Sequence, residues 1–268
     1  MRSPMADSDD QACLPQAQQD RRFGGLGRLY GKDPAARIRA SHVVVVGIGG
    51  VGSWAAEALA RSGVGRLTLI DMDHVSESNV NRQIQALSST LGMAKIGAMQ
   101  ERISQINPDC QVHCIDDFVT PDNWPQLLPT GVHAVIDACD QVQAKLAMAQ
   151  WARSTDAIFI SVGAAGGKKS AEKVCVGDLS SATHDPLLAQ LRYRLRKFHS
   201  APREGKRIGL TVVYSAEPVL GAQAGDGVQS DNTLNCHGYG SSVAVTASFG
   251  MCAAGWVMNM LSKCDLAA

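Results

Sequence analysis

Short apolar runs alternate with amphipathic segments over the first 162 residues of the chain. The apolar runs cover residues 43–46, 67–70, 111–115, 134–136 and 158–162, and the first is four valines followed by glycine. Runs of this kind are typical of central parallel strands buried on both faces. Residues 51–62, 93–106 and 141–155 have helical spacing between them. The alternation predicts a Rossmann-like, doubly wound α/β fold, with a mainly parallel sheet and helices on both faces.

The pattern weakens after residue 167. Residues 173–176 and 210–214 are expected to form strands and residues 186–198 a helix, which together make an antiparallel C-terminal extension. Residues 221–240 are rich in Gly, Asn and Asp and indicate a long loop. Residues 1–20 are polar and irregular, so we expect a disordered lead-in before a single domain over residues 21–268.

The segment 243–261 is apolar and lies within a stretch, residues 232–262, that has no Asp, Glu, Lys or Arg. Its length is enough to cross a bilayer. Serine, threonine, asparagine and several glycines interrupt it, so its hydrophobicity is modest. We therefore favour a helix buried on a face of the sheet, with C-terminal or peripheral membrane association as the alternative.

Composition removes several classes of function. The formal net charge is zero, so any contact with RNA depends on a local basic patch. None of the 8 cysteines forms a C-x-x-C pair, which excludes paired C-x-x-C zinc sites. No secretory signal is recognisable, so we expect reduced thiols, a cytoplasmic location and no obligatory membrane.

A glycine-rich turn follows the first expected strand. Gly47, Gly49 and Gly52 give G-x-G-x-x-G at the start of a helix, with Gly50 as a further glycine. These glycines permit a tight turn, a close approach of the backbone to phosphate, and close packing of helix and strand. Asp71 ends the next strand, at the spacing of a carboxylate that binds ribose. The pattern predicts a nucleotide site without separating NAD from ATP.

The loop after Asp71 favours ATP. Its polar residues are Asp73, Ser78, Asn79, Asn81, Arg82 and Gln83, and Lys95 follows on the next helix. Arginine and lysine beside a nucleotide suit a polyphosphate. Asp137 and Asp140 follow the fourth strand, where a carboxylate can hold Mg²⁺ against phosphates. The simpler alternatives are that Asp140 caps a helix and that Lys95 is a solvated charge.

This set of motifs resembles the ubiquitin-activating superfamily, which includes the ThiF/MoeB-type adenylyltransferases. The matching elements are G-x-G-G-x-G, D-x-D-x-V-x-x-S-N-x-N-R-Q, the lysine and D-x-x-D, within residues 22–162. The resemblance implies a carboxylate-activating enzyme in which Arg82, Lys95 and Asp140 are catalytic. It places Gly50, Asn81, Arg82 and Lys95 on the phosphates, Asp71 on ribose, and Asp140 on Mg²⁺.

The resemblance also implies a homodimer. Members of the superfamily commonly insert an arginine, from an N-terminal R-Y-x-R-Q element, into the ATP site of the neighbouring subunit. Here the element reads Arg22-Phe23-Gly24-Gly25, so Gly25 replaces the second arginine. Arg22 and Arg28 are the candidates for a replacement.

Two departures narrow the choice within the superfamily. The zinc pairs of many sulfur-carrier adenylyltransferases are absent, and the chain is too short for a ubiquitin-type catalytic cysteine domain. The segments that resemble the tRNA threonylcarbamoyladenosine dehydratases are residues 22–25, 28–31, 47–59, 116–123 and 163–167. This implies ATP-dependent dehydration, by cyclisation, of a modified adenosine in the tRNA anticodon loop, with a sulfur-transfer or cysteine-desulfurase system as a further candidate partner.

Two other interpretations stay open at this point. One is an adenylyltransferase that activates the C-terminus of a ubiquitin-like sulfur carrier. The other is an NAD-dependent oxidoreductase or a nucleotide sensor, against which Asn81, Arg82, Lys95 and Asp140 count.

The best candidate for tRNA contact is a basic helix. Its cations are Arg192, Arg194, Arg196 and Lys197, interleaved with Tyr193 and Phe198. Cations and aromatics together suit phosphate contact and base stacking. A solvated helix face with two core aromatics is a nearly equal alternative. Cys236, next to His237, is the one thiol whose environment suggests reactivity, although a loop cysteine without chemistry is favoured.

Overall fold

The protein is organised around one seven-stranded sheet. The computed structural model describes residues 16–155, 157–220 and 239–264. The strands are β1 (His42–Val46), β2 (Arg66–Ile70), β3 (Gln111–Ile115), β4 (Ala134–Asp137), β5 (Ile158–Val162), β6 (Val174–Asp178) and β7 (Thr211–Ser215). Their order is β3-β2-β1-β4-β5-β7-β6, and only β6 runs antiparallel to its neighbour. The predicted fold class, including the antiparallel extension, is confirmed.

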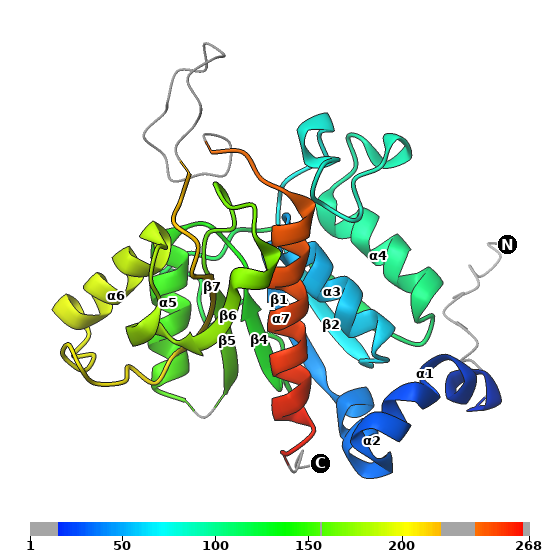
Figure 1. Ribbon diagram of the computed structural model, residues 1–268. Coiled ribbons are helices and arrows are strands. Elements are labelled where there is room, and N and C mark those ends of the chain that lie inside the picture. The colour runs from blue at the N-terminus through cyan, green and yellow to red at the C-terminus, as the bar shows by residue number, and fades with distance from the viewer. Residues whose placement is uncertain (1–15, 156, 221–238, 265–268) are drawn as a thin grey trace, which may run out of the picture.

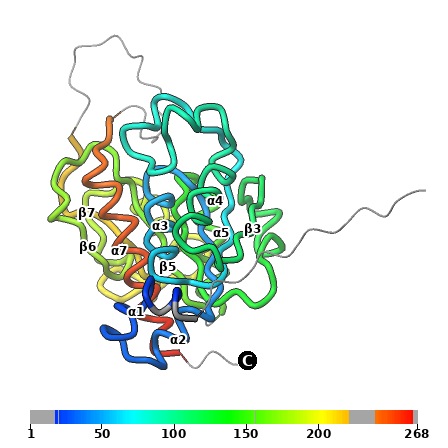
Figure 2. Tube along the Cα trace, turned by 90° about the vertical axis from the view of Figure 1, so that its right-hand side faces the viewer, coloured from blue at the N-terminus to red at the C-terminus, as the bar shows by residue number. Residues whose placement is uncertain are grey.

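Helices cover both faces of this sheet (Figure 1). They are α1 (Gln16–Tyr30), α2 (Lys32–Ala40), α3 (Gly52–Arg61), α4 (Lys95–Ile106), α5 (Val142–Arg153), α6 (Pro186–Phe198) and α7 (Val243–Leu261). Buried side chains of α3, α4 and α7 share one core cluster, and those of α5 and α6 share another. Seen from the side, α7 lies beside β6 and β7 on the same face as α3 (Figure 2). The topological switch lies between β1 and β4, where ligands bind in folds of this type.

Two boundaries differ from those expected. α1 begins at Gln16, so residues 16–20 of the expected lead-in are helical, consistent with the good helix propensity of glutamine. Residues 1–15 lie outside the described residues. β6 and β7 start one residue later than predicted, because the antiparallel register pairs Val174 with Ser215 and Asp178 with Thr211.

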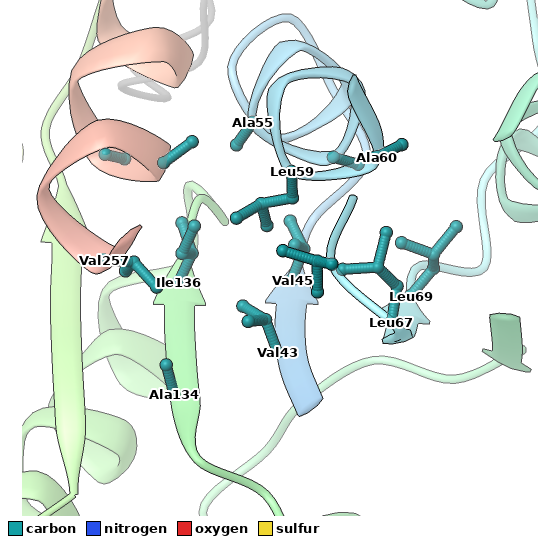
Figure 3. Close-up of a cluster of buried hydrophobic side chains, with 14 of the residues drawn as sticks. Val43, Val45, Ala55, Leu59, Ala60, Leu67, Leu69, Ala134, Ile136 and Val257 are labelled. Atoms are coloured by element: carbon teal, nitrogen blue, oxygen red, sulfur yellow. The ribbon is translucent and has the colours of Figure 1, made fainter. Parts of the chain in front are cut away.

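The core on the α3 face is built from alternating strand positions. Figure 3 shows Val43 and Val45 of β1 on the same face as Ile136 of β4, below Leu59 of α3. Each of these side chains is fully buried. Val257 of α7 joins the same cluster. This packing fixes the height of α3 above the sheet, and therefore the position of the glycine turn that precedes it.

Helix α7 is part of this core. By length and composition it is the one helix, among the described residues, apolar enough to cross a membrane. Its side chains Val245, Phe249 and Val257 are nevertheless fully buried against α3 and the sheet. A Cβ atom at Gly250 would lie 2.5 Å from the carbonyl oxygen of Val51, so the two helices cross almost in backbone contact. The structure therefore agrees with the buried-helix interpretation.

The crossing of α3 and α7 gives a stability prediction. Gly250→Ala is expected to destabilise the protein by about 1–3 kcal/mol, because the new methyl group overlaps the α3 backbone. Gly255→Ala is the matched control on the same helix, since a Cβ atom there meets nothing within 4 Å. The control is expected to stabilise by roughly 0.5–1 kcal/mol, because alanine is the better helix former. Urea unfolding of both variants checks this, and an equal effect of the two would contradict the close crossing.

Candidate nucleotide site

The glycine turn after β1 is shaped by backbone contacts with the end of β4. Gly47 has φ 85°, in the left-handed region that favours glycine. A Cβ atom on Gly47 would lie 2.9 Å from the carbonyl oxygen of Ala138, and one on Gly52 would overlap the carbonyl oxygen of Gly47. A Cβ atom on Gly49 would meet nothing within 4 Å, and Gly49 lines the cavity. The turn thus has two glycines required by the fold and one that leaves room for a ligand.

Asp71 ties this turn to the second strand. Its Oδ2 accepts a hydrogen bond from the Ile48 N–H at 2.6 Å, and its Oδ1 accepts one from the Asp73 N–H at 2.8 Å. Burial raises the pKa of the Asp71 carboxyl above its usual value, whereas nearby Lys95 and the two N–H groups lower it. Asp71 lines the cavity at the end of β2, the place expected for a ribose-binding carboxylate.

Lys95, the first residue of α4, points its ammonium group at Asp73. The Nζ–Oδ2 distance is 2.6 Å, and the lysine side chain is 9% exposed against 55% for the aspartate. The backbone N–H of Lys95 also donates to the Asp73 carbonyl oxygen at 2.9 Å. Lys95 is therefore a fixed, nearly buried cation in the cavity wall, and the solvated-charge alternative is wrong.

Arg82 is held over the glycine turn. Its carbonyl oxygen accepts from the Trp54 indole N–H at 2.9 Å, and its guanidinium donates to the Ser78 carbonyl oxygen at 2.6 Å and to Asn81 Oδ1 at 3.0 Å. A Cβ atom on Gly50 would lie 3.2 Å from Arg82 Cγ. The arginine stem therefore lies against Gly50, and Arg82 lines the cavity.

The two acids at the end of β4, Asp137 in the strand and Asp140 after it, have different surroundings. Asp137 is fully buried: its Oδ1 accepts from Lys145 Nζ at 3.0 Å and its Oδ2 from the Ser161 hydroxyl at 2.6 Å. Asp137 does not line the cavity, so the expected direct contact with a cofactor is not what the structure shows. Asp140 lines the cavity and is exposed, with no hydrogen bond or ion pair to any described residue. It does not cap the next helix by a side-chain hydrogen bond.

Cys139 lies between these acids. Burial raises the pKa of its thiol well above the usual value, and the carboxylate of Asp137 raises it further. Its Sγ lies 3.1 Å from Asp137 Oδ1. Cys139 is the one cysteine among the described residues that line the cavity, and it stays protonated at neutral pH. Cys236 lies outside the described residues.

These groups surround a cavity of about 510 Å³, a size typical of small-molecule sites. Of the predicted residues, Gly47, Gly49, Gly50, Asp71, Asp73, Asn79, Arg82, Gln83, Lys95 and Asp140 line it. Gly52, Ser78, Asn81 and Asp137 lie behind or beside its wall. Asn81 instead donates from Nδ2 to the Ser241 carbonyl oxygen at 3.3 Å, which connects the loop after β2 to the residues just before α7.

Several lining residues were not expected. Thr246 of α7 lies beside Gly50, with its Cγ2 3.4 Å from the position of an added Cβ atom. Phe118, Gly163, Ala164 and Leu187 line other parts of the cavity. The glycine-rich run after β5 was a visible signal for Gly163, but nothing in the sequence indicates that Thr246 reaches a turn almost 200 residues earlier.

The basic helix α6 is not a uniform cationic face. Arg192 donates to the carbonyl oxygens of Leu179 and Ala182, and Arg196 donates to that of Pro202, so both hold the local fold. Lys197 lies 5.3 Å from the ring centroid of Tyr193 and 5.1 Å from that of Phe198. These two rings are 57% and 62% exposed, so they are not core aromatics. Of the four predicted cations, Arg192 and Arg196 are therefore occupied by backbone carbonyl groups, and Arg194 and Lys197 are the ones left for contact with a polyanion.

Comparison with known proteins identifies the family. The model of the ThiF family matches residues 25–267. The chain belongs to the ThiF family.

Relatives of this ThiF-family chain are similar over nearly their whole length. A tRNA threonylcarbamoyladenosine dehydratase of Haemophilus influenzae is 43% identical over 91% of the chain and 94% of the relative. The enzyme of the same name from Escherichia coli is 42% identical over 90% and 94%. The crystal structure of the Escherichia coli dehydratase, TcdA, in complex with ATP has a TM-score of 0.83 at 40% identity, covering 92% of this chain and 96% of that one. A second structure of that enzyme contains AMP.

Two glycines in the turn of this ThiF-family site are expected to have different roles, one in ATP binding and the other in folding. Gly49→Ala is expected to weaken ATP binding about tenfold or more without lowering the unfolding midpoint, because its methyl group enters only the cavity. Gly52→Ala is expected to destabilise the fold, because its methyl group overlaps Gly47. Calorimetric titration with ATP and thermal unfolding of both variants check this. Unchanged ATP affinity in Gly49→Ala would contradict the placement of phosphate at this turn.

Proposed function

We propose that the protein is an ATP-dependent tRNA threonylcarbamoyladenosine dehydratase. The observation that carries the proposal is the convergence of Arg82, Lys95 and Asp140 on one cavity at the glycine turn. Two cations and a free carboxylate around a phosphate-binding turn suit activation of a carboxylate by ATP. Relatives that span nearly the same length supply the substrate class.

The chemistry needs no nucleophile from the protein. A carboxylate oxygen of the threonyl group attacks the α-phosphorus of ATP, and pyrophosphate leaves, by analogy with adenylate formation in the superfamily. A neighbouring nucleophile of the same substituent then attacks the acyl carbon, the ring closes, and AMP leaves with the former carboxylate oxygen. The substrate loses one oxygen and two hydrogens in total. Proximity within the substrate drives the attack, in agreement with the protonated Cys139 thiol.

The residues of the cavity have separate parts in this scheme. Lys95 and Arg82 offset the negative charge that grows on the phosphates, Gly49 leaves space for them, and Asp71 binds ribose. Asp140 is a free oxygen ligand of the kind that Mg²⁺ prefers, and phosphates with water would complete the shell. When bound, Mg²⁺ would neutralise charge on the phosphates.

We also propose a homodimer in the cytoplasm. The outer side of α7 exposes Val243 and Met251, and Leu29 of α1 is 78% exposed. Tyr30 donates a hydrogen bond to Asn259, so the C-terminal end of α1 lies against the C-terminal end of α7. Arg22 donates to the Ile106 carbonyl oxygen of its own chain, which leaves Arg28 as the better candidate for the partner's site.

Sedimentation velocity tests the proposed homodimer. A monomer at micromolar concentration would contradict it. A sulfur-transfer or cysteine-desulfurase partner remains a proposal from resemblance alone.

The dehydratase is tested on tRNA that carries threonylcarbamoyladenosine. Incubation with ATP and Mg²⁺ is expected to remove one water from that nucleoside, as measured by mass spectrometry. Asp140→Asn is expected to lower the rate about 100-fold or more, because the metal ligand is weakened while the side-chain size is kept. Asp109→Asn, on the loop after α4, is the control. A nucleoside unchanged by the wild type, with ATP consumed when a ubiquitin-like sulfur carrier is added, would favour the adenylyltransferase.

Contact with tRNA is tested on the open part of α6. Arg194→Glu with Lys197→Glu is expected to weaken tRNA binding about tenfold or more and to spare ATP binding, because phosphate contacts give way to repulsion. Lys32→Glu with Lys263→Glu makes the same change in net charge at exposed positions elsewhere. Filter binding at two salt concentrations measures the effect. Equal affinity of the two double variants would exclude α6 as a tRNA surface.

A further inference from the structure

The wall of the cavity beyond β4 is formed by small and apolar residues rather than by charged ones. The nucleotide groups lie at β1, β2 and the loops that follow them, whereas Gly163, Ala164 and Ala165 follow β5 on the other side of β4. Leu187, in the first turn of α6, completes this wall. In the proposed reaction the acyl group must extend from the phosphates into the space that remains, and this wall borders that space.

Asp185, at the N-terminus of α6, holds the wall in place. Its side chain is buried, at 5% exposure, and each oxygen accepts one backbone hydrogen bond. Oδ1 accepts from the Leu188 N–H at 3.0 Å, which caps α6, and Oδ2 accepts from the Ala164 N–H at 2.9 Å. A Cβ atom on Gly163 would overlap Oδ2, so the carboxylate lies directly against the wall. The helix cap requires only one carboxylate oxygen, Oδ1, so the second oxygen, Oδ2, is free to hold the Ala164 backbone in place.

A buried lysine fixes the residue that precedes Asp185. Lys168, 2% exposed, donates to the carbonyl oxygens of His184 at 3.0 Å and Glu217 at 2.7 Å. His184 has φ 54°, a left-handed conformation that is unfavourable in a residue other than glycine. The Glu217 carboxylate in turn accepts from the N–H groups of Lys169 and Ser170. The loop after β5, the start of α6 and the end of β7 are thus fixed to one another.

We propose that Asp185 is a positioning residue for the acyl substrate. It sets the place of the Gly163–Ala164 backbone against which the threonylcarbamoyl group lies during activation and ring closure. This inference rests on the proposed dehydratase function. It assigns the nucleotide and the acyl group to opposite sides of β4, so a change at Asp185 affects tRNA turnover and not nucleotide affinity.

The test is Asp185→Asn, with Asp178→Asn as the matched control. Asparagine keeps an oxygen for the helix cap, but its NH₂ group then faces the Ala164 N–H, and two donors oppose each other. Asp178, the last residue of β6, is the N-cap of the 3-10 helix Leu179–Ser181, and its Oδ1 accepts from Ser180 and its Oδ2 from Gly209, away from the cavity. Gly163→Ala is a second variant that displaces the same wall, because the added methyl group would overlap the Asp185 carboxylate. All proteins are compared at a temperature at which circular dichroism shows them folded.

The readouts are kcat and KM for modified tRNA and the calorimetric Kd for AMP. In Asp185→Asn and Gly163→Ala, kcat/KM for tRNA is expected to fall about 10- to 100-fold, as for a small misplacement of reacting groups, with the Kd for AMP changed less than about twofold. Asp178→Asn is expected to keep both values. A loss in Asp185→Asn no larger than in the control, or a Kd for AMP that rises as much as kcat/KM falls, would overturn the positioning role. A wild type that binds AMP but removes no water from tRNA would overturn the proposed function itself.

Discussion

The contact between the glycine turn and the end of β4 is the constraint on which the site depends. Gly47 meets the backbone of Ala138 at a distance that no side chain permits, and Gly52 lies against Gly47 itself. The start of α3 is therefore locked to the strand that carries Asp140. Because α3 also rests on Val43, Val45 and Ile136, the same core that stabilises the sheet sets the distance between the turn and that carboxylate.

Buried charges fix the remaining parts of this edge. Asp71 joins the turn to β2 through the Ile48 N–H, and the pair of Asp137 with Lys145 joins β4 to α5. A fully buried ion pair is costly to desolvate and contributes little net stability, so its value lies in the geometry that it imposes. The hydroxyl of Ser161 on β5 completes that network, which extends the alignment to the strand that carries the acyl-side wall.

The sequence was sufficient for the parts of the site that are local. The glycine turn, Asp71, Lys95 and Asp140 lie within or next to predicted strand ends, and parallel topology brings such ends together. The positions of residues that depend on tertiary packing could not be predicted from the sequence. Asp137 looks like a second ligand until the burial of Lys145 is known, and Thr246 reaches Gly50 only because α7 crosses α3. The sequence predicts Arg192 and Arg196 to be free cations, because the spacing of residues along a helix does not reveal that backbone carbonyl groups bind them.

The cations of the cavity have partners that are easily exchanged. Lys95 is nearly buried, but the side chain of its partner Asp73 is 55% exposed, so water can solvate the aspartate when the pair separates. Arg82 is held by the carbonyl oxygen of Ser78 and the amide oxygen of Asn81, neither of which is charged. A polyphosphate thus meets cations that are already in place and loses little by displacing their present partners. Asp137, whose ion pair is fully buried, is the opposite case: it keeps Lys145 out of the cavity and leaves Asp140 as the free carboxylate of the D-x-x-D pair.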